Sequence, residues 1–572
     1  MDNPRHSIRW LASTTLALIT CQCASRAAAP AAAYAPTPTA ETLLAPWVSS
    51  TEPGVAVAVS VDGEVVYARG AGLANLEHAR PIEPQTVFQV ASVSKQFTAF
   101  SVLLLVAEGK IELDAEIQRY IPELQVRGVT VRNLLDHTGG LREAVSLTAM
   151  AGWSDDDIRT QAQVLDLIVQ QAKGNFPAGA RVEYSNSGYV LLAEMVARAS
   201  GMSFPEFTQT RLFEPLGMKN TRFLRERHTL IPGRASSYFP SKGGFKNIIV
   251  GSEVRGATGL YTTALDLLKW EENFVTQQVG SDAVFEGMAE RAVAQDGERS
   301  PFAKGQERRV YQGLVTWSHG GRDAGYRSFV LRVPSHRFAL AILSNRTDFD
   351  TAALAFALVD AFLRDAPGYT PEPPETWNPV KRNELDSFAG TYQMFPGVIF
   401  TLTASDSGLT FASLGQSGEG LDPLPQVGHR RFMLNPGSDI SIAFAPPVRG
   451  ISPSFDYTIG LHGVIRVKRI ELSPFDSTRV RLDDFVGEFY SEELGARYAL
   501  SVVDGQLSAR HRRQPAFALS PYQTDTFLSA NGPLQRVRFT RRSDGTVIGF
   551  LASAPLAEGI VFERVPTQPP SS

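Results

Sequence analysis

Residues 89–97 read QVASVSKQF, and this stretch places Ser92 three positions before Lys95 at the start of an apolar run. The run continues to Gly109, a residue type that commonly ends a helix, and it predicts a helix over residues 92–108. Because positions i and i+3 share one face of a helix, the hydroxyl of Ser92 and the amine of Lys95 can meet.

The predicted helix is apolar on nearly every side, which indicates a central, buried position and therefore a buried Lys95. A lysine amine has an ordinary pKa of about 10.4 and is almost wholly protonated at pH 7. Burial and the positive end of a helix both lower this pKa, and a lowering by three pH units costs about 4 kcal/mol of folding free energy. An S-x-x-K pattern alone arises about once or twice by chance in a chain of this length. The apolar context instead indicates that Lys95 takes part in chemistry.

Strand patterns stand before and after the helical region. Residues 54–72 predict two strands joined at Asp62 and Gly63, an Asp-Gly hairpin signal. Residues 326–334 and 337–345 predict two further strands. Strands at both ends of a helical region are typical of an α+β domain.

Three more helices are predicted within this domain. One covers residues 187–199, with Gly201 as its stop. A second begins at Thr263, where Asp266 would complete a capping box. A third, over residues 351–363, closes the domain.

Residues 1–33 have the pattern of a secretory signal peptide, with a basic start, a short apolar run over residues 10–20 and many small residues. Cleavage after Ala33 fits an A-x-A pattern, and the mature protein is expected in the periplasm. The LITC segment ending at Cys21 resembles a lipoprotein signal except for Thr20, so a lipid anchor at Cys21 stays open. No apolar run reaches the ~18 residues of a membrane-spanning helix, so no integral span is expected.

Composition excludes several classes of function. Both cysteines, Cys21 and Cys23, lie in the leader, so no disulfide is expected in the mature chain. The formal net charge is -4 and no run of five like charges occurs, which argues against a nucleic-acid partner. The histidines lack metal-ligand spacing such as H-E-x-x-H, so neither a metal nor a cofactor is expected.

A proline-rich segment, DAPGYTPEPPETWNPV at residues 365–380, marks a domain boundary. The prediction is a first domain over residues 41–366, a linker over residues 367–380, and two β-modules over residues 381–475 and 476–572.

The two β-modules are inferred from a repeat. LDSFAGTY at Leu385 recurs as LDDFVGEF at Leu482, 97 residues later, and DSGLTF at Asp406 is echoed by DGQLSA at Asp504. Two all-β modules in tandem explain both pairs, and chance similarity is the alternative.

Two further motifs carry candidate site residues. The sequence EYSNSGY places Tyr184 and Asn186 just before a predicted helix, and SHGGRDAGYRS places His319, Gly320 and Gly321 at the start of a strand. A loop tyrosine is more often a packed aromatic, and paired glycines more often form a turn, although they also permit a ligand to approach the backbone.

Taken in this order, the three motifs resemble those of the serine β-lactamase and penicillin-recognising DD-peptidase superfamily. The closest likeness is to its class C-like branch of D-aminopeptidases, DD-carboxypeptidases and esterases. The resemblance spans residues 43–363 and includes LLDHTGGL at Leu134, FEPLGMKNT at Phe213 and GATGLYTTALDLLKW at Gly256. It implies an α+β fold, in which an antiparallel sheet flanked by helices and an α-rich subdomain precede two small barrel-like modules.

The resemblance also implies roles for the first two motifs. Ser92 would be the nucleophile, Lys95 its activating partner and Tyr184 the general base for acylation and deacylation. Asn186 would contact the substrate amide. No match to the acidic loop of class A β-lactamases occurs, which leaves Tyr184 to activate the water.

The third motif would form the other wall of the site. The resemblance assigns His319, Gly320, Gly321 and Arg322 to substrate binding, with the backbone N–H of Arg322 completing an oxyanion hole beside that of Ser92. His319 stands where β-lactamases carry a lysine. A histidine with an ordinary pKa near ~6.5 is mostly neutral at physiological pH, so its pairing with a β-lactam carboxylate is expected to be weak.

The resemblance therefore implies a secreted serine hydrolase that cleaves an amide through an acyl-enzyme on Ser92, with peptides containing D-amino acids as favoured substrates. A family esterase or β-lactamase is one alternative, and a non-catalytic penicillin-binding sensor is another. The ligand expected is a small peptide or ester, and a homo-oligomer stays open. The β-modules resemble lipocalin-like barrels of D-aminopeptidases, which could shape the rim of the site or act only as scaffold.

Overall fold

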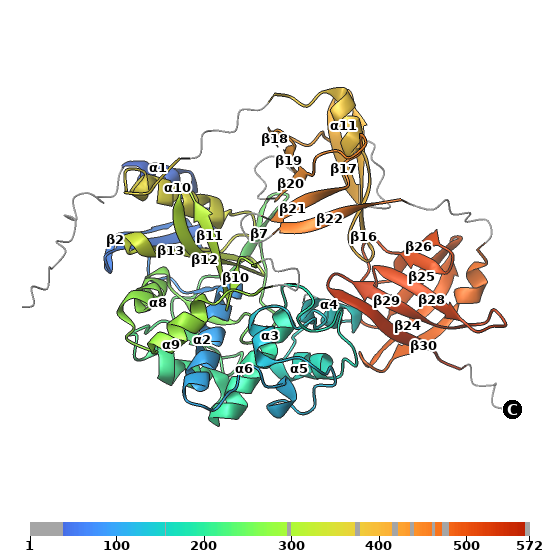
Figure 1. Cartoon of the computed structure of the whole chain (residues 1–572), viewed down its shortest axis with the longest axis horizontal. Helices are drawn as coiled ribbons and strands as arrows, with labels where there is room; N and C mark the ends of the chain where they lie inside the picture. Colours follow the sequence, from blue (N-terminus) through green and yellow to red (C-terminus); the bar gives the residue numbers. More distant parts are fainter. Residues whose placement is uncertain are drawn as a thin grey trace, which may run out of the picture.

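The computed structural model describes residues 38–154, 156–293, 299–371, 378–413, 421–434, 440–459, 464–471 and 480–566. The predicted leader, with Cys21 and the cleavage after Ala33, lies outside the described residues. The described chain forms a first part of helices and sheet, followed by two parts made mostly of strands (Figure 1).

A seven-stranded antiparallel sheet forms the middle of the first part, in the order β10-β11-β12-β13-β14-β1-β2. Its strands are β1 (Val55–Val61), β2 (Glu64–Ala71), β10 (Phe302–Ala303), β11 (Gln306–Tyr311), β12 (Leu314–Asp323), β13 (Tyr326–Val333) and β14 (Phe338–Ser344). Asp62 and Gly63 join β1 to β2 with φ angles of 52° and 83°, so the predicted hairpin is confirmed.

Helices cover both faces of this sheet (Figure 1). The helices described in the first part are α1 (Pro38–Leu44), α2 (Ser94–Ala107), α3 (Val131–Leu135), α4 (Ala144–Met150), α5 (Gln161–Val169), α6 (Asn186–Ser200), α7 (Phe204–Thr208), α8 (Ala264–Thr276), α9 (Asp282–Ala289) and α10 (Thr351–Leu363). The helices α1 and α10 share one core with Val57 and Phe329, while α2, α6 and α8 share the other with Ala58 and Val330. Every residue of β1 is buried as a result. The α+β fold is confirmed.

Two of the predicted helix ends can be compared in detail. Gly201 ends α6 with φ 72°, as predicted. At α8, Thr263 accepts a hydrogen bond from the backbone N–H of Asp266, but the predicted return bond of a capping box is wrong. The Asp266 carboxylate instead accepts hydrogen bonds from the backbone of Asn220 and from the hydroxyl of Thr221, because α8 packs against that loop.

Short strands connect the helical region to the sheet. They are β3 (Leu73–Asn75), β4 (Arg80–Pro81), β5 (Phe88–Gln89), β6 (Arg222–Phe223), β7 (Tyr238–Ser241), β8 (Gly244–Asn247) and β9 (Leu260–Thr262). Because β9 lies between β5 and β6, Gln89 pairs with Tyr261, and the segment before the S-x-x-K motif is held by backbone hydrogen bonds.

Each of the two later parts contributes eight strands to the described residues. The first of these two β-modules follows α11 (Arg382–Phe388). Its strands are β15 (Gly390–Phe395), β16 (Val398–Ser405), β17 (Gly408–Ser413), β18 (Gln426–Gly428), β19 (Arg431–Met433), β20 (Ile440–Phe444), β21 (Ser454–Ile459) and β22 (Val464–Ile470). The second contains β23 (Gly487–Ser491), β24 (Ala496–Val503), β25 (Gln506–His511), β26 (Phe517–Gln523), β27 (Thr526–Leu528), β28 (Arg536–Arg541), β29 (Val547–Ala554) and β30 (Ala557–Arg564). The second closes into a barrel, whereas the described strands of the first form an open sheet.

The sequence repeat corresponds to a structural repeat in these two modules. Gly390 and Gly487, 97 residues apart, have φ angles of 149° and 147°, a region that favours glycine. A Cβ on either glycine would come within 3 Å of an arginine guanidinium from the last strand of the same module, Arg469 or Arg564. Each guanidinium also lies over the aromatic ring two positions after the glycine. The repeated segment is therefore the start of the same strand arrangement in both modules.

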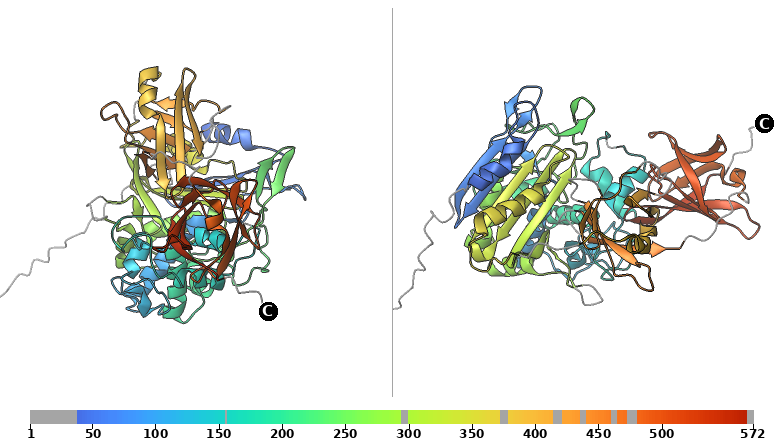
Figure 2. Two further views of the ribbon diagram at one scale, coloured as in Figure 1. Left: turned by 90° about the vertical axis from the view of Figure 1, so that its right-hand side faces the viewer. Right: turned by 90° about the horizontal axis from the view of Figure 1, so that it is seen from above.

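The closed barrel packs directly on α4 of the first part. Leu147 and Met150 of α4 belong to the hydrophobic core of the barrel, and the Tyr498 hydroxyl donates to the Met150 carbonyl at 3.0 Å. Figure 2 shows the barrel at the opposite end of the molecule from β1 and β2. The barrel and the helical region thus share one core.

Candidate active site

Ser92 lies in a single 3-10 turn, Ala91–Val93, immediately before α2. Ala91 has φ 47°, an unfavourable conformation for alanine, and it is held there by the side chain of Gln89, which accepts a hydrogen bond from the Ala91 N–H at 2.9 Å. Gln89 is fixed in turn by a 2.6 Å hydrogen bond to the carboxylate of Asp323 at the end of β12. The turn presents Ser92 half-buried above the helix.

Lys95 is fully buried, and its amine lies among three oxygen atoms. Nζ donates to Ser92 Oγ at 3.1 Å, to Asn186 Oδ1 at 2.7 Å and to the Ala257 carbonyl at 2.8 Å. Burial lowers the pKa of Lys95 to about 7, although the negative charge of Glu143 acts in the opposite direction. A large fraction of this amine is therefore neutral near pH 7 and able to take the Ser92 proton.

Tyr184 lies across the amine of Lys95, with Nζ 4.7 Å from the ring centroid. Its ring stacks on His137 at 4.6 Å, and His137 Nδ1 accepts a hydrogen bond from the Ser185 N–H. Burial raises the pKa of Tyr184 far above its ordinary value, although a hydrogen bond with Ser92 lowers it. The phenol is therefore neutral at physiological pH and can pass a proton on, whereas Lys95 is the stronger candidate for the first acceptor.

Asn186 begins α6 and connects Lys95 to a carboxylate. Its side-chain oxygen accepts from Lys95, while its side-chain nitrogen donates to Glu143 Oε1 at 2.8 Å and its backbone N–H donates to Glu143 Oε2 at 2.8 Å. Glu143, the N-cap of α4, is itself buried. The interior hydrogen bonds of Asn186 hold both the lysine and the start of α6.

The third motif lies on β12, against the Ala91–Val93 turn. His319 is buried, with Nδ1 2.6 Å from the Gly320 carbonyl and its ring 6.3 Å from that of Tyr184. A Cβ on Gly321 would come within 2.3 Å of the Val90 carbonyl, so this glycine is required by the protein's own backbone. Arg322 follows on the same strand with its side chain exposed. The structure thus brings all three motifs together.

Three contributors to the site were missed in the sequence: Glu143, His137 and Gln89. Glu143 and His137 follow or lie within the LLDHTGGL segment, but their partners Asn186 and Ser185 are 43 and 48 positions away. Gln89 stands in the opening stretch, yet its partner Asp323 is 234 positions away. Because Glu143 and His137 both lie in or just after the LLDHTGGL segment, that segment was a signal that could have identified them.

The second β-module also reaches the site. The turn between β29 and β30 contains Leu556, whose φ is 57° and whose carbonyl accepts hydrogen bonds from the Glu143 N–H and from Asn175 Nδ2, both at 2.8 Å. Because Glu143 binds Asn186 and Asn186 binds Lys95, three consecutive hydrogen-bonded contacts connect the barrel with Lys95.

The described residues contain no group of three or more His, Cys, Asp or Glu side chains arranged to hold a metal ion. Among the helices of the described chain, none combines the length and apolar character needed to cross a membrane.

Comparisons with known proteins by family, by sequence and by structure agree with one another. A family model described as Beta-lactamase matches residues 40–363. The chain is 28% identical to penicillin-binding protein 4* of Bacillus subtilis over 70% of this chain and 88% of that protein. It is 28% identical to a D-aminopeptidase of Gluconobacter oxydans over 56% of this chain, and spans 60% of that protein's length. The solved octameric penicillin-binding protein homologue from Pyrococcus abyssi superposes with a TM-score of 0.52 at 21% identity, over 83% of this chain and 97% of that one, a likeness of fold.

Proposed function

Because the chain belongs to the beta-lactamase family, we propose that it is a serine hydrolase that cleaves an amide bond through an acyl-enzyme on Ser92. The observation that carries this proposal is the fully buried Lys95 with its amine 3.1 Å from Ser92 Oγ. Its lowered pKa makes it a base matched to neutral pH.

In the first half of the reaction, Ser92 Oγ attacks the substrate carbonyl carbon while its proton passes to neutral Lys95. The backbone N–H groups of Ser92 and Arg322 are assigned to the developing oxyanion. Tyr184, whose ring centroid lies 4.7 Å from Lys95 Nζ, relays the proton from Lys95 to the leaving amine, which departs as the acyl-enzyme forms. The tetrahedral intermediate collapses, the carbonyl re-forms as the C–N bond breaks, and Lys95 is neutral again.

In the second half, water attacks the acyl carbon. Lys95 and Tyr184 take the water proton and return a proton to Ser92 Oγ as the ester bond breaks. The products are a carboxylic acid and the amine released earlier. His319, Gly320 and Gly321 on β12, with Asn186 on the facing side, are assigned to holding the substrate backbone between the two walls.

We propose peptides or amides with a D-amino acid on the acyl side as the favoured substrates. The names of the D-aminopeptidase relatives support this choice. His319 stands where β-lactamases carry a lysine, and the replacement of that permanent cation argues against a substrate selected mainly by a carboxylate.

A substrate panel tests the proposal by comparing kcat/KM for D-aminoacyl amides, the matching L-aminoacyl amides, D-Ala-D-Ala peptides, short esters and a chromogenic cephalosporin. The expected order places D-aminoacyl amides first. Ser92→Ala should lower kcat by a factor on the order of 10⁴ to 10⁶ with the fold retained. Preference for esters would favour the esterase alternative. Binding of a penicillin without turnover of any substrate would favour the sensor.

We further propose that the enzyme works outside the cytoplasm. The signal-peptide pattern of residues 1–33 supports this. The N-terminal peptide of protein recovered from the cell envelope tests it by mass spectrometry: a start just after Ala33 or a lipid-modified Cys21 is expected, and an intact leader on all of the protein would contradict it.

A further inference from the structure

A cavity of about 380 Å³ is lined in part by Gln89, which precedes the Ala91–Val93 turn that carries Ser92. Segments of residues 224–237 and 247–255 form most of its wall, and the rest is formed by Gln89, Gly259, Tyr261 and Tyr326. None of the side chains assigned above to the reaction lines it. The cavity is therefore separate from the Ser92 site, although Gln89 holds Ala91 beside Ser92.

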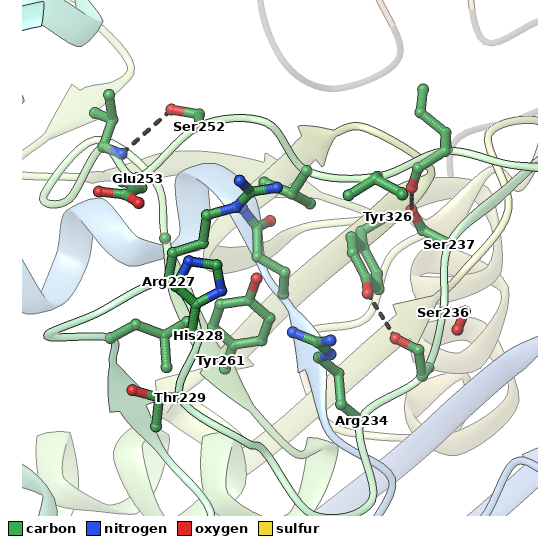
Figure 3. A pocket seen from close by; sticks show the side chains of 18 of the residues that line it. Arg227, His228, Thr229, Arg234, Ser236, Ser237, Ser252, Glu253, Tyr261 and Tyr326 are labelled. Carbon is green, nitrogen blue, oxygen red and sulfur yellow. Dashed lines mark hydrogen bonds between the residues drawn. The ribbon is translucent and has the colours of Figure 1, made fainter. Parts of the chain in front are cut away.

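Three arginines line this cavity: Arg227, Arg234 and Arg255. Figure 3 shows Arg227 and Arg234 on either side of Tyr261, with Glu253 at the edge. Glu253 is the one carboxylate in the lining, and none of the three guanidinium groups forms an ion pair with a carboxylate of the described chain. The cavity therefore carries net positive charge.

Several other arginines of the first part are paired with carboxylates. Arg132 binds Asp114 at 2.7 Å, Arg332 binds Glu271 at 3.0 Å, and Arg346 binds Glu52 at 3.0 Å. Holding several unneutralised cations around one hollow costs free energy through their mutual repulsion. An anion in the cavity would remove this cost.

The cationic groups are partly fixed in place before any ligand arrives. Arg255 donates to the carbonyls of Leu224 and Arg225 at 2.5 and 2.7 Å, and the side chain of Arg234 lies beside Tyr261 (Figure 3). Because side chains held in place lose less entropy on binding, such an arrangement favours a specific ligand over diffuse counter-ions.

Two exposed apolar side chains belong to the lining of the cavity. Leu230 is 87% exposed and Ile249 is 73% exposed, and both line the opening. Neither belongs to a hydrophobic core, so both would gain by covering an apolar group. The volume is at the lower end of the ~300–1,000 Å³ typical of small-molecule sites.

We propose that this cavity binds a small organic carboxylate with an apolar substituent. The carboxylate meets Arg227 and Arg234, where guanidinium groups can bind it in a bidentate manner, and the apolar group covers Leu230 and Ile249. The proposal is independent of the reaction at Ser92.

Calorimetric titration of the full-length Ser92→Ala protein with 3-phenylpropionate tests this site. The matched amide, 3-phenylpropanamide, has the same shape without the charge, and inorganic phosphate has the charge without the apolar group. We expect 3-phenylpropionate to bind at least tenfold more tightly than either, and more weakly as the salt concentration rises. Arg227→Gln and Arg234→Gln should each weaken its binding about tenfold.

The matched control is Arg225→Gln. Arg225 lies on the same loop, pairs with Glu206 at 3.2 Å with its side chain 63% exposed, and does not line the cavity. It should leave the affinity unchanged. Equal losses from Arg225→Gln and Arg234→Gln, equal affinity for acid and amide, or no binding at millimolar concentration would overturn the proposal. Phosphate binding as tight as that of 3-phenylpropionate would overturn its apolar part. Since no turnover is measured, failure here leaves the proposed hydrolase untouched.

Discussion

Lys95 combines complete burial with three oxygen acceptors and, among the described residues, no ion-pair partner. Its pKa of about 7 means that the folded protein binds this proton far less tightly than the unfolded chain does. This lysine lowers the free energy of unfolding, most of all below pH 7. Such a cost is consistent with a role for the neutral amine as a proton acceptor.

The activity should depend on pH through this amine. As the pH rises through about 7, Lys95 loses its proton, so kcat/KM should rise about tenfold per pH unit below that value and level off above it. Tyr184 stays neutral throughout, because burial raises its pKa far above its ordinary value. Steady-state rates between pH 5 and 9 provide the measurement, and a flat profile over this range would contradict the role of Lys95.

Stability should depend on the same proton with a defined sign. Between the lowered folded pKa of about 7 and the unfolded value of about 10.4, the unfolded chain binds more protons, so the stability contributed by this group increases as the pH rises through that window. The free energy of unfolding of the wild type should therefore increase relative to Lys95→Met between pH 7 and 10, by roughly 3 to 4 kcal/mol. Denaturant titrations of both proteins check this. A constant difference would mean that the lysine is not desolvated.

At the scale of elements, the site is the meeting point of four segment ends: the turn before α2, the starts of α4 and α6, and the end of β12. The apolar runs of α2 and α10, and the glycine stops after α2 and α6, were readable because helix periodicity is local. The positive φ of Ala91 was not, since it depends on a Gln89–Asp323 hydrogen bond across 234 positions. For the same reason the capping box at Thr263 was wrong: Asp266 found partners on a distant loop.

The start of α4 positions the start of α6. In Glu143→Gln, one carboxylate oxygen that accepts from Asn186 becomes an N–H₂ group that faces a donor, so Asn186 must shift away from Lys95. We expect kcat to fall about tenfold or more. Since the Glu143 charge raises the pKa of Lys95, its removal should also move the acidic limb of the pH profile to lower pH.

The control for this variant is Glu194→Gln on the outer face of α6, where the carboxylate pairs with Arg198. It should change neither kcat nor the limb. If Glu143→Gln lowers kcat but leaves the acidic limb of the pH profile in place, the role of Glu143 is purely structural.

At the scale of the whole molecule, the barrel is part of the folded core of the first domain. The sequence repeat predicted two related β-modules, and the equivalent glycine–arginine contacts support their common origin. The docking on α4 could not be predicted, because nothing local in either segment identifies its partner. Leu147 and Met150 read as ordinary residues of a short helix, yet they are buried against the barrel.

Breaking the docking should affect stability and catalysis together. Arg142 has a side chain only 3% exposed, pairs with Glu493 at 2.6 Å and donates to the carbonyl of Glu558. Arg142→Met leaves the Glu493 carboxylate unpaired, a change that typically costs about 3–5 kcal/mol for a buried pair. We expect a lower midpoint of thermal unfolding and, through Leu556 and Glu143, a lower kcat.

Arg497→Met on the outside of the same barrel is the matched control. Its pair with Glu488 is exposed, and such pairs contribute about 0–1 kcal/mol. Equal effects of the two variants, or full activity in a destabilised Arg142→Met protein, would show that the barrel is scaffold and does not position the site.

The measurement that tests the central claim most directly is intact-protein mass spectrometry of enzyme quenched with acid during turnover of an activated D-aminoacyl ester, followed by peptide mapping. The account predicts one added acyl group on the peptide that contains Ser92, and none in Ser92→Ala. A wild-type protein that turns the ester over with no adduct, or with the adduct on another residue, would contradict it.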